Sequence, residues 1–112
     1  MVAFEPHKLS DHFSRHHVRL GLKSEKEYQR KASEFLLTSA AERGIQDCTR
    51  KYGDLVRYDP ITDEFGVLSS AGIIRTYFKA VPCHALLLPA PMLDCHKGGL
   101  SNLDYFLSEC GK

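Results

Sequence analysis

Two histidines one helical turn apart give this sequence its clearest chemical signal. His12 and His16 lie four residues apart, so on a helix both side chains project from one face and can act on one substrate. Imidazoles that titrate near neutral pH can act as general base and general acid on an RNA phosphodiester, one activating the 2′-OH and one protonating the leaving 5′-oxygen. The spacing could also bind zinc, but the zincin pattern needs Glu after the first His, and Phe13 stands there. Alternatively, both histidines merely flank an apolar stripe.

A second group of chemically useful side chains lies between Ile73 and Lys79, where the residues alternate as in a strand. Arg75 and Lys79 can stabilise negative charge on a pentacoordinate phosphate, and Tyr77 between them can stack a base or donate to a phosphate. Arg57 adds another cation if its strand presents the same face. The opposite face, expected to meet the helices, carries Ile74, Thr76 and Phe78. The alternative is that these cations only keep the surface soluble.

The elements that must position these groups begin with two helices. Apolar residues at helical spacing predict a short amphipathic helix within residues 8–20, which Gly21 ends. Ser24 and Glu27 form a capping box that predicts a second helix from Glu25. This helix should run for about 18 residues, to Gly44, and be the longest element.

Strand signals replace the helical stripe after Gly44. The segments expected to form strands are residues 45–51, 54–58, 64–68 and 73–79. Connections this short join antiparallel neighbours, so the sequence predicts a four-stranded antiparallel meander with the two N-terminal helices packed on it. Residues 100–110 can add a last helical turn or two. The expected class is therefore α+β.

Length, charge and hydropathy bound the function. With 112 residues, the chain is expected to form one domain over 1–112. The net charge is +1, but residues 1–58 hold 11 Lys and Arg against eight Asp and Glu, so the N-terminal half is the candidate anion-facing part. The longest apolar run, residues 85–93, is far shorter than the roughly 20 residues that span a bilayer. We expect no membrane span and no secretory signal.

The four cysteines leave several alternatives open. None forms a CxxC pair, but Cys83-His84 and Cys95-His96 repeat a doublet that could supply a Cys2His2 zinc site. Adjacent side chains of a strand point to opposite faces, which makes such doublets awkward ligands. Disulfides or buried thiols are the other interpretations.

The order and spacing of four segments resemble a known group of toxins. The chain looks like the C-terminal toxin domains of bacterial polymorphic and contact-dependent growth inhibition systems, in the barnase, EndoU, colicin and RelE-like (BECR) ribonuclease group. The likeness covers about residues 8–80 and rests on residues 11–16, 24–35, 57–67 and 72–78.

This resemblance implies a BECR-like fold that cleaves RNA, often tRNA, without a metal ion or other cofactor. By position, the catalytic residues would be His12, His16, Arg75, Thr76 and Tyr77. We assign RNA contacts to Arg15, Arg57 and Lys79.

The resemblance also implies partners and a location. A cognate immunity protein, expected to be acidic, would neutralise a toxin that is delivered as part of a larger secreted or surface protein and acts in the target-cell cytoplasm. Because a charge of +1 gives little non-specific contact with RNA, a host protein could help to present the substrate. The alternatives are a non-catalytic binding module of a phage or secretion system and a zinc-stabilised interaction module.

Overall fold

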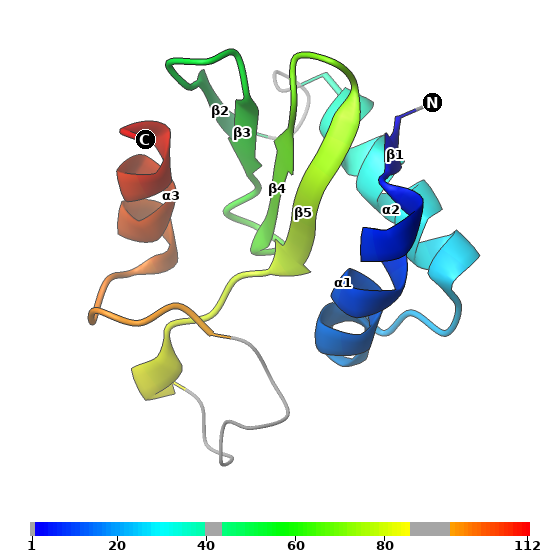
Figure 1. Cartoon of the computed structure of the whole chain (residues 1–112). Helices are drawn as coiled ribbons and strands as arrows, with labels where there is room; N and C mark the ends of the chain where they lie inside the picture. Colours follow the sequence, from blue (N-terminus) through cyan, green and yellow to red (C-terminus); the bar gives the residue numbers. More distant parts are fainter. Residues whose placement is uncertain (1, 40–43, 86–94) are drawn as a thin grey trace.

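A mixed β-sheet forms the middle layer of the molecule (Figure 1). The computed structural model describes residues 2–39, 44–85 and 95–112, and within these ranges the sheet has five strands in the order β1-β5-β4-β3-β2. The strands are β1 (Ala3–Phe4), β2 (Gln46–Thr49), β3 (Leu55–Tyr58), β4 (Glu64–Leu68) and β5 (Ile73–Lys79). Strands β2 to β5 pair antiparallel in chain order, whereas β1 pairs parallel to β5.

The α+β class is confirmed, and the four strands of the meander lie in the segments where they were expected. The prediction of a purely antiparallel, four-stranded sheet is wrong, because β1 adds a parallel edge strand. This strand pairs only Ala3 with Ile73 and Phe4 with Ile74. Two residues are too few to show an alternating pattern, so only the tertiary pairing defines the strand.

The two N-terminal helices have clear local causes. Helix α1 (Pro6–Leu20) has a proline at its first position, and Gly21 ends it with φ 69°, in the left-handed region that glycine tolerates. Helix α2 (Glu25–Leu37) begins as the capping box predicts, because the Ser24 side chain accepts from the Glu27 amide at 3.1 Å.

Helix α2 is shorter than expected, and α1 is the longer of the two. Its C-cap residue Thr38 is extended, and the Thr38 hydroxyl donates to the Glu34 carbonyl at 2.5 Å. This side-chain hydrogen bond competes with continuation of the helix. Residues 40–43 of the expected helix lie outside the described residues.

One hydrophobic core lies between α2 and the sheet. Gly66 of β4 allows the close approach, since a Cβ there would lie 3.1 Å from Leu36 and 3.4 Å from Phe35. The buried members of this core are Phe4, Leu22, Tyr28, Ala32, Phe35, Leu36, Ile74 and Tyr77.

A second core lies on the other face of the sheet, beneath α3 (Asn102–Cys110) (Figure 1). Its buried members are Val56, Tyr58, Phe65, Val67, Ala80 and Phe106. The C-terminal helix therefore packs on the second face of the sheet, and the domain has three layers. The sequence pattern indicated this helix but not the face that it covers.

Strand β5 contains a bulge that changes the predicted faces. Val67 pairs with Thr76 and Leu68 with Ile74, so Arg75 is an extra residue without a partner across β4. An extra residue breaks the alternation of side chains. Ile74 and Tyr77 therefore both face α2, whereas Thr76 and Phe78 face the α3 side. The prediction that Thr76 and Phe78 share the face of Ile74 is wrong.

All four cysteines are paired in disulfides. Cys48 of β2 is bonded to Cys110 at the end of α3, and Cys83 in the 3-10 turn Cys83–Ala85 is bonded to Cys95. Zinc coordination by cysteine requires thiolates, which these bonds consume. The disulfide interpretation thus fits the structure, and the zinc-stabilised module does not.

Candidate active site

A pocket of about 320 Å³ opens where α1, β5, α3 and the segment after Cys95 meet. It is lined by Arg15, His16, Thr76, Phe78, Cys95, His96 and Tyr105. Two imidazoles, a guanidinium and two hydroxyls thus converge from parts of the chain that are distant in sequence. These groups can exchange protons and bind an anion in one place.

His16 is the central predicted residue of this pocket. Helix α1 follows β1 and lies beside β5 at the edge of the sheet, so His16 reaches the face that carries Phe78 (Figure 1). The two rings stack with centroids 5.2 Å apart, and His16 is only 6% exposed. The stacking fixes the plane of an imidazole that lines the pocket.

Arg15 supplies positive charge at the pocket. Its guanidinium donates to the Asp11 carboxylate at 3.0 Å and lies 3.5 Å from Nδ1 of His12. The side chain is 43% exposed, so the guanidinium is accessible to an anionic ligand. The predicted RNA-contact residue Arg15 therefore lies next to His16 in space as well as in sequence.

The far wall of the pocket consists of His96 and Tyr105, neither of which is a predicted site residue. Their rings stack with centroids 4.4 Å apart and an interplanar angle of 10°. Burial, reinforced by the carboxylate of Glu109, raises the pKa of Tyr105 to about 12, so its phenol remains a neutral hydrogen-bond donor at physiological pH. The Cys95-His96 doublet is the sequence signal for this wall, although its pattern also suggests a zinc motif.

Several of the predicted catalytic and RNA-contact residues do not line this pocket. His12 lies one turn before His16, with ring centroids 5.9 Å apart, and packs against Phe4. Arg75 is paired with Asp54 at 3.0 Å. Of the predicted last-strand group, only Thr76 lines the pocket.

Tyr77 and Lys79 lie on the opposite face of β5 because of the bulge. Tyr77 is fully buried between Tyr28 and Phe35, and its hydroxyl donates to the Glu64 carboxylate. Tyr28 in turn donates to the backbone carbonyl of Tyr77. The predicted role of Tyr77 in base stacking does not fit this position.

These buried phenols predict a loss of stability at alkaline pH. Burial is the largest cause that raises the pKa of Tyr28, Tyr77 and Tyr105. Above about pH 10, an unfolded chain loses phenolic protons that the folded chain retains, so the free energy of unfolding should fall as pH rises from about 10 to about 12. Urea unfolding at stepped pH checks this, and Tyr105→Phe should make the decline shallower. A free energy that stays level over this range would contradict it.

Arg57 has a structural position that accounts for its charge. Its guanidinium donates to the carbonyls of Phe35, Leu36 and Thr38, at the C-terminal end of α2, and to the Asp47 carboxylate at 3.0 Å. The last carbonyls of a helix have no partner within the helix and carry partial negative charge. Because Arg57 is only 7% exposed, the RNA contact assigned to it is not retained.

We expect Arg57→Ala to destabilise the fold by about 1.5–3 kcal/mol, the range for losing hydrogen bonds to a charged group. Arg75→Ala is the matched control, because its ion pair with Asp54 is more exposed and should contribute less than about 1 kcal/mol. Chemical unfolding of both variants measures the difference. Equal stability of the two variants would refute the capping role of Arg57.

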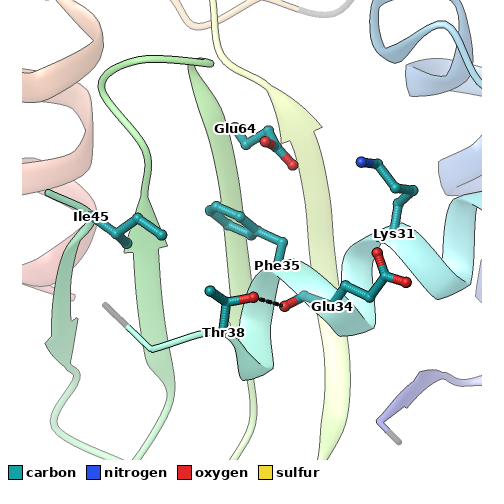
Figure 2. Close-up of a pocket in the computed structure, with 6 residues that line it drawn as sticks. All are labelled: Lys31, Glu34, Phe35, Thr38, Ile45 and Glu64. Carbon is teal, nitrogen blue, oxygen red and sulfur yellow. Dashed lines mark hydrogen bonds between the residues drawn. The ribbon is translucent and has the colours of Figure 1, made fainter. Parts of the chain in front are cut away.

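A smaller pocket of about 110 Å³ lies at the end of α2, on the other face of the sheet (Figure 2). Figure 2 shows α2 contributing its polar side chains and Glu64 facing them from β4. The lining residues are Lys31, Glu34, Phe35, Thr38, Ile45 and Glu64. The lining includes no imidazole, and we therefore place the candidate chemistry at the larger pocket.

No protein-family model matches the chain, and no curated protein sequence matches it. Within the described ranges, the structure holds no cluster of three or more His, Cys, Asp or Glu side chains suited to a metal ion. None of the described helices is long and apolar enough to cross a membrane.

Proposed function

We propose that the chain is an endoribonuclease toxin domain that cleaves RNA, foremost tRNA, without a metal ion. The observation that carries this proposal is the pocket in which His16 and Arg15 of α1 meet Thr76 of β5. The two helices followed by an antiparallel meander support the BECR-like fold that the sequence resemblance implies.

The pocket groups divide into acid–base and electrostatic roles. His16 exchanges a proton with an RNA oxygen, and Arg15 neutralises the charge that grows on the phosphorane in the transition state. Thr76 and Tyr105 line the same space and donate hydrogen bonds to phosphate oxygens. The product of such transesterification is a 2′,3′-cyclic phosphate.

Incubation of the purified domain with total tRNA in EDTA tests this proposal. We expect discrete fragments that end in a 2′,3′-cyclic phosphate, because acid–base groups alone perform the reaction. Intact tRNA in both EDTA and Mg²⁺ would refute the enzyme and favour a non-catalytic binding module. Cleavage only with the metal would refute the proposed mechanism.

The proposed partners and location follow from the same toxin hypothesis. The toxin domain would be delivered as part of a larger secreted or surface protein to the target-cell cytoplasm, where a host protein could present the RNA. We expect a net acidic immunity protein that covers Arg15 and the mouth of the pocket, since opposite charges favour docking there. Arg15→Glu should weaken this complex, as measured by calorimetry, whereas Lys112→Glu should not. Equal affinities of both variants would contradict this contact.

A further inference from the structure

Hydrogen bonds of both its backbone amide and its backbone carbonyl hold His96 in place. Its amide donates to the Val81 carbonyl and its carbonyl accepts from the Cys83 amide, both at 3.0 Å. Its neighbour Cys95 is bonded to Cys83, so the disulfide joins the same two segments as these hydrogen bonds. These contacts fix the backbone of His96. The residue is 8% exposed and lines the pocket.

Asn102 determines which ring nitrogen of His96 carries the proton. The side-chain Nδ2 of Asn102 donates to the Ala80 carbonyl at 3.1 Å, which orients the amide. Its Oδ1 therefore points to His96, 2.8 Å from Nε2. Because an amide oxygen only accepts, Nε2 must carry the hydrogen.

The other nitrogen of the ring is then an unprotonated base in the neutral form. Nδ1 of His96 is buried and has no hydrogen-bond partner among the described residues. A proton placed there without a partner would be a buried, unsatisfied donor, which is costly. His96 lines the pocket but Nδ1 itself is covered, so a substrate oxygen must displace its covering to supply the missing partner.

We infer that His96 is the general base of the pocket, with Nδ1 as the atom that accepts the proton. This inference rests on the proposed ribonuclease function. Nδ1 removes the proton of the 2′-OH, and the 2′-oxygen forms a bond to phosphorus. The bond from phosphorus to the 5′-oxygen breaks, and His16 donates a proton to that leaving oxygen. Proton exchange with water restores both imidazoles.

His84 offers a matched control for this role. It follows Cys83 as His96 follows Cys95, but its side chain is exposed and does not line the pocket. Replacing His96 by alanine should slow tRNA cleavage by about 10²- to 10⁴-fold, and added imidazole should restore part of the rate. His84→Ala should cleave at the wild-type rate.

An NMR experiment that correlates the ring nitrogens and protons of the wild-type domain measures the tautomer without depending on activity. We expect the neutral ring to be protonated at Nε2 and bare at Nδ1. A proton on Nδ1, or rapid cleavage by folded His96→Ala while the wild type is active, would overturn the inference alone. A wild-type domain that leaves tRNA intact would overturn the proposed function, and the role of His96 with it.

Discussion

Replacement of His16 by alanine is expected to slow tRNA cleavage by about 10²- to 10⁴-fold, the loss typical of one acid–base group. His16 lines the pocket and is stacked on Phe78, so its ring has a fixed direction toward a bound substrate. Because the ring is buried, alanine also leaves a cavity. His16→Gln fills more of the space and should be as inactive as His16→Ala, since an amide does not exchange protons near neutral pH.

His12→Ala is the control for this experiment. The sequence spacing predicts equal losses at both histidines, but His12 does not line the pocket and packs against Phe4. We therefore expect His12→Ala to retain most of the activity. Single-turnover cleavage of tRNA by folded variants measures both effects. Full activity of His16→Gln would remove His16 from the mechanism, and a matching large loss at His12 would restore the predicted pair.

Loss of the disulfide between Cys48 and Cys110 is expected to lower the free energy of unfolding by about 4 kcal/mol. The bond spans a sequence separation of 62 and ties the end of α3 to the edge strand β2. In the chain-entropy account, a longer closed loop restricts the unfolded chain more. Urea unfolding of Cys48→Ala/Cys110→Ala against the parent protein measures the loss.

The second disulfide provides the comparison. Cys83 and Cys95 are separated by 12 residues, so the same account gives a smaller loss of about 3 kcal/mol for Cys83→Ala/Cys95→Ala. This variant should also cleave RNA much more slowly than the parent protein, because the bond lies beside His96 and Cys95 lines the pocket. A larger stability loss at the short loop, or unaltered cleavage by that variant, would contradict the expectation.

The parts of the fold that sequence predicted are those with local causes. Ser24 and Glu27 define the start of α2 through hydrogen bonds between near neighbours, and Gly21 ends α1 through its own backbone conformation. The four antiparallel strands follow from short turns between segments with strand-forming residues. The end of α2 was not predictable in this way, because Arg57 binds its last carbonyls from β3, which is distant in the sequence.

The candidate site was predicted in part for the same reason. His16 and Arg15 follow from helical spacing, and Thr76 lies in the segment that was selected. The bulge at Arg75 depends on pairing with β4, and it places Tyr77 on the α2 face with Ile74, and Thr76 on the opposite face. The far wall, formed by His96 and Tyr105, needs the α3 layer and a disulfide to bring it to α1. Neither of these follows from the periodicity of the sequence.

The order of synthesis determines when the pocket can form, because its lining residues come from segments that are far apart in the sequence. Arg15 belongs to α1 and Tyr105 to α3, and strands β2 to β5 lie between these helices in the sequence. Synthesis adds roughly 5–20 residues per second, and N-terminal parts emerge from the ribosome first. A nascent chain therefore displays α1 for several seconds before α3 is made, but it has no complete pocket. An RNA-cleaving site assembled this way would arise only after α3 has been synthesised.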